Sequence, residues 1–129
     1  MEERSITDCE LLVIKVIWGN EEAMSIKDIQ ARVNNQYNKE WKIQTVSTFL
    51  ARLVRKNYLR MERRGRSFFY YPLVTEEEYG RMEIVKCVDM WGNGKINALL
   101  SAFSAVRGLT EEEKQSIREI IDNGADNLE

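Results

Sequence analysis

Apolar side chains recur at helical spacing in three stretches of the first half of the chain. The spacing predicts a helix over about Asp8–Trp18, a second that follows Ser25 and ends near Asn34-Asn35, and a third over residues 43–57. The third has the cleanest pattern, because its apolar positions fall at i, i+3, i+4, i+7 and i+8 and form one stripe. That stripe consists of Val46, Phe49, Leu50, Leu53 and Val54.

Two runs rich in β-forming residues follow the third helix and predict a hairpin. The run Tyr58–Met61 and the aromatic run Phe68–Tyr71 lie on either side of Gly65. Alternation turns two of the four aromatic side chains inward, which favours a packed strand over a platform for stacking bases. Pro72, the only proline, closes the second strand near an edge, where a missing N–H is tolerated. A short strand at Ala23–Ser25 adds a third member to this sheet.

The second half of the chain, from Thr75 onward, is helical and acidic. Helices are predicted over about Glu76–Trp91, Lys95–Val106 and Glu111–Asp122, with breaks at Gly92-Asn93-Gly94 and at Gly108. A threonine followed three residues later by glutamate marks a helix start, because the two side chains satisfy free N–H groups of the first turn. This capping box occurs at Thr7, Thr75 and Thr110.

The order helix, helix, helix, hairpin is that of a winged helix-turn-helix domain. We expect a mainly α fold with a small β-hairpin wing, in which residues 1–74 form the winged-helix domain and residues 75–129 form dimerisation helices. The apolar faces of those last helices are too large for a lone extension and fit an interface between two copies. The expected dimerisation residues are Tyr79, Met82, Trp91, Ile96, Leu99, Leu100, Phe103, Val106, Ile117, Ile120 and Ile121.

Histidine is absent, which narrows the chemistry open to this chain. Its absence removes Ser-His-Asp and Cys-His catalysis as well as His-ligated zinc. Cys9 and Cys87 are too few for an all-cysteine zinc site, which needs four thiolates. The paired acids that start at Glu76 and Glu111 lie in first turns of helices, where they act as caps. We therefore expect a protein that is not an enzyme and that holds no metal and no cofactor.

The charge is unevenly distributed, although the net charge is only −2. Lys and Arg outnumber Asp and Glu by 13 to 9 through Val74, and acids outnumber bases by 12 to 6 after it. Between Lys42 and Arg66, eight basic residues are opposed by Glu62 alone. Such a concentration indicates an anionic partner, with a solvated basic face as the equal alternative.

The third helix carries polar side chains opposite its apolar stripe. Thr45, Thr48, Arg52 and Arg55 share a face at i, i+3, i+7 and i+10, which suits a helix that reads the major groove. An amphipathic surface helix with cations near its C-terminus explains the same pattern. Arginines at the hairpin tip favour the first interpretation, because they repel one another until an anion binds. The candidate DNA-binding residues are Lys42, Gln44, Thr45, Ser47, Thr48, Arg52, Arg55, Arg63, Arg64 and Arg66, with Lys56 as a flanking residue.

Three segments resemble the penicillinase-repressor family of the BlaI/MecI/CopY type: ITDCELLVIKVIW, WKIQTVSTFLARLVRKNYL and the wing RRGRSFFYYP. The resemblance covers about Ile6–Asp122, and its most specific part is TVSTFLARL at Thr45–Leu53. It implies a homodimeric repressor that binds a palindromic TACA/TGTA-type operator and negatively regulates genes such as those of antibiotic resistance. Gln44 stands where β-lactamase repressors usually carry lysine. The family's DNA-reading positions match the wing, Thr45, Thr48 and Arg52.

The resemblance also bears on regulation. Members that respond to β-lactams are cut at an Asn-Phe bond by a membrane-bound sensor protease, which makes such a protease a candidate partner. The matching bond is Ala102-Phe103, in which the phenylalanine is kept and the asparagine is not. Phe103 also belongs to an amphipathic stripe that suits a dimer core. The Cys-x-Cys pairs of copper-responsive members are missing from the C-terminal residues, so no inducing signal is assigned.

The location and the alternative function follow from the same residues. The opening stretch Met1–Asp8 is acidic and polar rather than a signal peptide, and two thiols without an export signal favour the cytoplasm. The alternative to a repressor is a winged-helix module that contacts other proteins and does not bind DNA specifically. Replacing the tip arginines separates the two, because only the repressor needs them.

Overall fold

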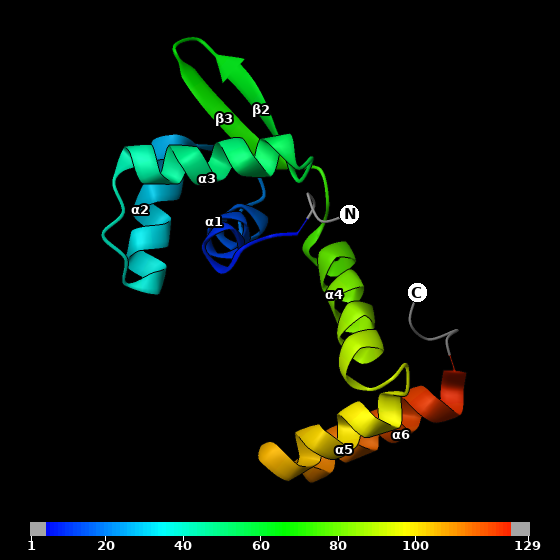
Figure 1. The fold of residues 1–129 in the computed structure, drawn as a ribbon. Coiled ribbons are helices and arrows are strands. Elements are labelled where there is room, and N and C mark those ends of the chain that lie inside the picture. The colour runs from blue at the N-terminus through cyan, green and yellow to red at the C-terminus, as the bar shows by residue number, and fades with distance from the viewer. Residues whose placement is uncertain (1–4, 125–129) are drawn as a thin grey trace. The chain divides into compact units, whose positions relative to one another are not determined.

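The computed structural model describes residues 5–124 and confirms the predicted order of elements (Figure 1). Helices occupy the predicted spans to within about two residues, and the short strand before the second helix forms. The elements are α1 (Asp8–Trp18), β1 (Met24–Ser25), α2 (Ile26–Tyr37), α3 (Ile43–Arg55), β2 (Leu59–Arg64), β3 (Ser67–Pro72), α4 (Glu76–Trp91), α5 (Ile96–Val106) and α6 (Glu111–Asn123). The chain divides into two compact units, residues 1–81 and 82–129.

Side-chain caps fix where most of the helices begin. Thr7 and Glu10 form a full capping box at α1, and Ser25 accepts a hydrogen bond from the Asp28 N–H at α2. The end of α2 was predicted near Asn34-Asn35, but the helix continues to Tyr37. It stops at Asn38, whose left-handed backbone (φ 58°) closes a hydrogen bond to the Asn34 carbonyl.

The strands form one antiparallel sheet in the order β1-β3-β2. Pro72 ends the central strand beyond the last residue that β1 pairs with, so its missing N–H leaves no gap in the ladder. The turn between β2 and β3 uses Gly65 at φ 64°, a conformation that strains other residues. Phe68 and Tyr70 lie on the same face of the sheet, as alternation predicts, but only Tyr70 is buried. Phe68 lies nearer the tip of the hairpin and is 40% exposed.

The core of the N-terminal unit lies where α1, α2 and α3 meet the base of the sheet. Its buried side chains come from every one of these elements. The three helices and the sheet therefore share one hydrophobic core. They are Val13, Ile14, Val16, Ile17, Met24, Ile29, Val33, Val46, Leu50, Leu53, Tyr58, Leu59, Tyr70 and Tyr79.

The start of α4 belongs to this N-terminal unit. The Trp18 indole donates a 2.8 Å hydrogen bond to the Val74 carbonyl, and Lys15 forms a 2.9 Å ion pair with Glu76. Tyr79 is 8% exposed and packs with its ring 5.8 Å from Trp18 and 5.7 Å from Tyr58. The unit boundary therefore follows Arg81 rather than residue 74, because the first turns of α4 complete the core.

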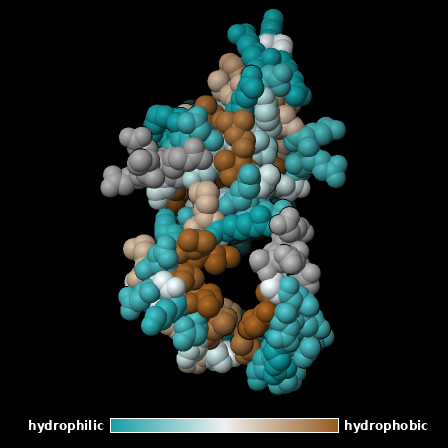
Figure 2. Space-filling model, turned by 90° about the vertical axis from the view of Figure 1, so that its right-hand side faces the viewer, coloured by the Kyte–Doolittle hydropathy of each residue, from teal (hydrophilic) through white to brown (hydrophobic). Residues whose placement is uncertain are grey.

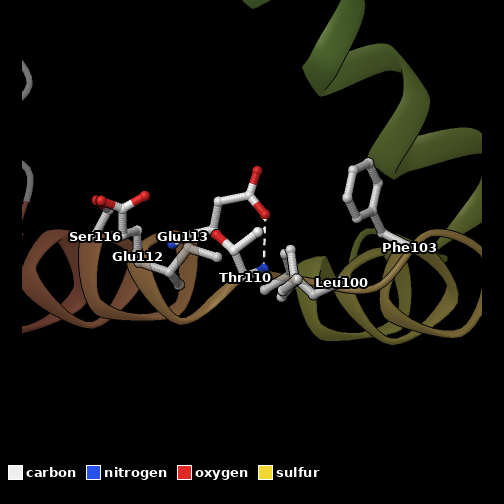
Figure 3. Close-up of a pocket in the computed structure, with 8 residues that line it drawn as sticks. Leu100, Phe103, Thr110, Glu112, Glu113 and Ser116 are labelled. Atoms are coloured by element: carbon white, nitrogen blue, oxygen red, sulfur yellow. Dashed lines mark hydrogen bonds between the residues drawn. The ribbon is translucent and has the colours of Figure 1, made fainter.

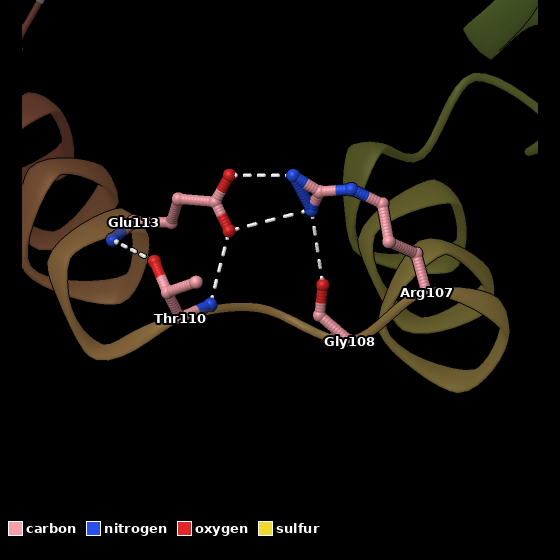
Figure 4. A network of polar contacts seen from close by, with 4 residues as sticks. All are labelled: Arg107, Gly108, Thr110 and Glu113. Atoms are coloured by element: carbon pink, nitrogen blue, oxygen red, sulfur yellow. Dashed lines mark hydrogen bonds and ion pairs between the residues drawn. The ribbon is translucent and has the colours of Figure 1, made fainter.

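The C-terminal unit is a set of helices without a buried core of its own. None of its described apolar side chains, from Met82 onward, is buried. Thr110 and Glu113 form the capping box of α6, and the Arg107 guanidinium adds a 2.7 Å ion pair to Glu113 (Figure 4). Among the described residues, no helix combines the length and apolarity needed to cross a membrane.

Candidate nucleic-acid interface

The helix α3 presents one polar face to solvent. Val46, Leu50 and Leu53 on its other side are fully buried, which fixes the rotation of the helix. Of the predicted residues on α3, Gln44, Ser47, Thr48, Arg52 and Arg55 are exposed and Thr45 is half-buried at the edge of the face. The structure thus brings these predicted residues together on one surface.

A hydrogen-bonded loop holds the beginning of α3. The Asn34 side chain bonds both the N–H and the carbonyl of Trp41, each at 3.0 Å, and Gln30 donates to the same carbonyl at 2.9 Å. The Trp41 ring packs 5.1 Å from Phe49. Sequence reasoning missed these positioning residues, because a polar side chain on α2 gives no sign of a bond to the next loop.

The first turn of α3 has no side-chain cap. Lys42 occupies the N-cap position, is exposed, and makes no capping hydrogen bond. Thr48 donates its hydroxyl hydrogen to the Gln44 carbonyl at 3.0 Å, which leaves the oxygen's lone pairs and the methyl group on the exposed face. The first two turns therefore offer N–H groups, a hydroxyl oxygen and a methyl group to whatever binds there.

Lys56, at the end of α3, does not flank this face as predicted. Its ammonium lies 2.6 Å from Oε1 of Glu10 and donates to the Ser5 carbonyl at 2.8 Å. The Glu10 side chain is fully buried and that of Lys56 is 14% exposed. The ion pair turns this lysine inward, so its role is to attach α3 to the start of α1. A lysine at a helix end gives no local signal of so distant a partner.

The hairpin carries the predicted wing arginines, but on different faces. Arg63 pairs with Phe68 across the hairpin and Arg64 with Ser67, so their side chains leave opposite sides of the sheet. A guanidinium nitrogen of Arg64 lies 3.1 Å from Oε1 of Glu62, and the guanidinium stacks over the Phe69 ring. The guanidinium of Arg63 stacks over the Phe68 ring, and its Nε donates a hydrogen bond to the Gly65 carbonyl. Arg66 is exposed in the turn.

The positive charge of this surface is largely uncompensated. Within residues 5–124, no acidic side chain forms an ion pair with the exposed cations Lys42, Arg52, Arg55, Arg60, Arg63 or Arg66. Figure 2 shows hydrophilic side chains around the far end of the hairpin, at the top of the view. Such a surface attracts a polyanion, and the exposed polar face of α3 lies within the same unit.

The predicted dimerisation residues are exposed or half-buried, with one exception. Tyr79 lies in the core of the N-terminal unit, so assigning it to a dimer interface was wrong. Leu99, Leu100 and Ile117 are half-buried. The remaining predicted residues are exposed: Met82 49%, Trp91 77%, Ile96 54%, Phe103 45%, Val106 89%, Ile120 48% and Ile121 69%. Sequence reasoning missed the equally exposed Ile84, Val85 and Met90 of α4.

An open apolar groove runs between α5 and α6. It has a volume of about 650 Å³, and Leu100, Phe103, Leu109 and Ile117 line it together with polar residues of α6 (Figure 3). Ala102 and Phe103, the candidate cleavage bond, are both exposed in the middle of α5. Apolar side chains of this unit also reach the surface in the lower half of Figure 2.

The described residues contain no cluster of three or more His, Cys, Asp or Glu that could hold a metal ion. Cys9 and Cys87 are free, half-buried thiols on α1 and α4. The acidic side chains Glu78 and Glu113 accept hydrogen bonds from the Thr75 and Thr110 N–H groups, which lower the pKa of both carboxyls. Both carboxylates therefore act as helix caps.

Known proteins are similar to this chain in sequence, and a solved structure is similar to its N-terminal fold. Residues 6–123 match the family model described as "Penicillinase repressor". The penicillinase repressor of Bacillus licheniformis is 29% identical over 117 residues, which cover 91% of this chain and 89% of that protein. The methicillin resistance regulatory protein MecI of Staphylococcus aureus is 25% identical, over 90% of this chain and 92% of that one. The solution structure of the DNA binding domain of the repressor BlaI matches with a TM-score of 0.51 at 32% identity, over 59% of this chain and 89% of that chain.

Proposed function

The chain belongs to the penicillinase repressor family of winged-helix DNA-binding transcriptional repressors, which are not enzymes, and we propose on that premise that it represses transcription as a homodimer on a palindromic operator. The observation that carries the proposal is the exposed polar face of α3 beside a wing on which Arg60, Arg63 and Arg66 form no ion pair with the described residues. A folded domain keeps such a charge concentration where it binds an anion.

Each part of this face has a distinct task at the DNA. The α3 helix enters the major groove, where Thr45 and Thr48 near its N-terminus reach base edges. A threonine offers a hydroxyl to a base and a methyl group to the C5-methyl of thymine. Gln44 prefers adenine, to which a side-chain amide bonds in a bidentate manner. The cations Lys42, Arg52 and Arg55 bind phosphates or guanine.

A twofold dimer requires a palindromic operator. Two copies of α3 then lie about one helical turn apart, roughly 34 Å, and require an inverted repeat, for which TACA/TGTA is our candidate. The apolar faces of α4, α5 and α6 supply the contact between copies. We propose that the repressor acts in the cytoplasm. Its targets are genes such as those of antibiotic resistance. Any event that separates the copies relieves repression, including cleavage at Ala102-Phe103 by a membrane-bound sensor protease.

The dimer is tested with charges placed on α5. Leu100→Asp and Phe103→Asp together put two carboxylates into the apolar face, and we expect a monomer that binds an inverted-repeat duplex at least tenfold more weakly. Ala98→Asp with Ser101→Asp is the matched control, because both of those side chains are exposed on the same helix. Sedimentation measures the oligomeric state, and a titration on the duplex measures affinity. An unchanged dimer with unchanged affinity in the first variant refutes this interface.

A further inference from the structure

Two amide side chains of α2 hold the backbone of the loop that leads into α3. The Asn34 amide accepts a hydrogen bond from the Trp41 N–H and donates one to the Trp41 carbonyl, each at 3.0 Å. Gln30, one turn earlier on α2, donates to the same carbonyl at 2.9 Å. Trp41 directly precedes Lys42, the N-cap residue of α3. We call these three bonds the amide clamp, and they fix the backbone one residue before the cap.

Burial of α2 sets the direction in which both amides point. Ile29 and Val33, which directly precede Gln30 and Asn34, are fully buried in the core of the N-terminal unit. The spacing of four residues places the two amides on the same side of the helix. The backbone carbonyl of Asn34 also accepts the Lys39 N–H at 3.1 Å, within the same loop. The amide clamp is therefore anchored by the apolar core.

The start of α3 depends on the amide clamp because it has no capping side chain. Lys42 makes no capping hydrogen bond, whereas threonines cap α1 and α6. A helix start without such a cap leaves N–H groups unsatisfied and is less stable. The Val46 N–H donates to the Lys42 carbonyl at 3.1 Å, and the Trp41 ring packs 5.1 Å from Phe49 in the second turn. Holding Trp41 thus holds the first two turns of α3.

We infer that Asn34 and Gln30 are positioning residues for sequence discrimination, an inference that rests on the proposed function. They act through the Trp41 backbone on the turns that carry Thr45 and Thr48. Hydrogen bonds to base edges are directional and weaken steeply when donor and acceptor are misaligned. Phosphate contacts from long cationic side chains tolerate a small shift and carry no sequence information. Losing the amide clamp therefore reduces discrimination between operator and other DNA, not the general attraction to DNA.

A substitution without charge change tests the inference. Asn34→Leu removes both Asn34 bonds at similar side-chain volume, and Asn35→Leu makes the same change at the next, exposed position of α2 as the matched control. Each variant is titrated on a TACA/TGTA inverted-repeat duplex, or on one selected from random sequence if the parent prefers it, and on a scrambled duplex. We expect Asn34→Leu to lower the affinity for the repeat about tenfold and that for the scrambled duplex about twofold at most. Asn35→Leu should change neither ratio.

The ratio of the two affinities separates positioning from a loss of folded protein. Partial unfolding lowers both affinities by the same factor, because unfolded chains bind neither duplex in the folded geometry, and so it leaves the ratio unchanged. Thermal unfolding of each variant reports the folded fraction independently. A fall in the ratio is therefore not explained by a merely structural role of Asn34.

Gln30→Leu provides a milder variant that keeps the fold. It removes one bond and leaves the Trp41 carbonyl paired with Asn34, so its effect on the affinity ratio should have the same direction and be smaller. Amide hydrogen exchange at Val46, measured without DNA, follows the opening of the first turn. It should become faster in Gln30→Leu and faster still in Asn34→Leu, and stay unchanged in Asn35→Leu.

A double-variant cycle identifies the residues through which the amide clamp acts. If Asn34 positions Thr48, the change Thr48→Ala costs less affinity for the repeat in the Asn34→Leu background than in the parent, because that base contact is already weakened. The same cycle with Gln30→Leu gives a smaller coupling of the same sign. Additive losses would show that the amide clamp and Thr48 act independently.

The possible results separate this inference from the proposed function. If the parent discriminates the repeat but Asn34→Leu and Gln30→Leu leave the affinity ratio unchanged, or their losses add to that of Thr48→Ala, the amide clamp does not position the base-reading residues and the repressor proposal stands. If the parent binds neither an inverted-repeat duplex nor duplexes selected from random sequence, both proposals fail.

Discussion

Lys56 at the end of α3 forms a 2.6 Å ion pair with Glu10 of α1, whose side chain is fully buried. Oε1 of Glu10 also accepts the Thr7 N–H of the capping box, and Oε2 has no hydrogen-bond partner among the described residues. One carboxylate thus joins the first turn of α1 to the last turn of the helix that we assign to base reading. The orientation of that helix depends on a charge pair as well as on apolar packing.

The first prediction concerns this pair. Lys56→Met leaves a buried carboxylate without its counter-ion, and we expect the free energy of unfolding to fall by about 3 kcal/mol. The double variant Lys56→Met/Glu10→Gln removes both charges and is expected to recover most of that loss. Urea unfolding of the single and double variants measures the coupling. Additive losses would show that the two side chains do not interact in solution.

A second prediction concerns Tyr79, which the sequence pattern assigned to the dimer interface. Because its ring packs between Trp18 and Tyr58, Tyr79→Ala is expected to lower the free energy of unfolding by roughly 3 kcal/mol. The dimer dissociation constant should stay the same. Ile121→Ala, at a 69% exposed position of α6, is the control. It should raise the dimer dissociation constant and leave the free energy of unfolding of the N-terminal unit unchanged. A weakened dimer with unchanged stability in Tyr79→Ala would contradict the placement of this residue.

The third prediction concerns acid stability. The Thr110 N–H donates to the Glu113 carboxylate, which together with Arg107 lowers the pKa of that carboxyl below its ordinary 4.5. A carboxyl whose pKa is lowered by folding stabilises the fold fully above the unfolded pKa, and that stabilisation is lost as the pH falls through the folded pKa. Glu78 behaves in the same way at the start of α4, where the Thr75 N–H is the main cause of its lowered pKa.

Glu113→Gln tests this behaviour, because glutamine keeps an oxygen for the Thr110 N–H but does not titrate. We expect the parent to be more stable than the variant near pH 7 and this advantage to vanish toward pH 3. Helix content and thermal unfolding followed from pH 7 to pH 3 measure the difference. A constant difference across that range would mean that the Glu113 carboxyl does not titrate in the way we describe.

Local signals in the sequence predicted the elements well. The capping threonines, the glycine at the hairpin tip and the apolar stripe of α3 each act within a few residues, so the helices and strands began and ended close to the predicted positions. The polar face of α3 followed directly from that stripe, because burying one side of a helix exposes the other.

Contacts between distant residues were not predictable in this way. Lys56 contacts Glu10, and Tyr79 contacts Trp18, only in the folded chain, so both residues were misassigned from local patterns.

One local signal was overlooked. Strand alternation alone places Arg63 and Arg64 on opposite faces of the hairpin. The partner of Arg64, Glu62, lies on the same strand, yet three tip arginines were treated as equivalent.

The central claim is that the exposed face of α3 reads an operator. The most direct measurement is a gel-shift titration near physiological salt on a TACA/TGTA inverted-repeat duplex and on a scrambled duplex, with the parent and with Thr48→Ala. Thr48→Val and Thr48→Ser serve as matched controls, since they keep the methyl group and the hydroxyl respectively. The account predicts tight binding to the repeat alone, weakened about tenfold or more in Thr48→Ala, as expected for one lost base contact. Equal weak binding to both duplexes with a steep salt dependence, or no binding to either, would contradict it.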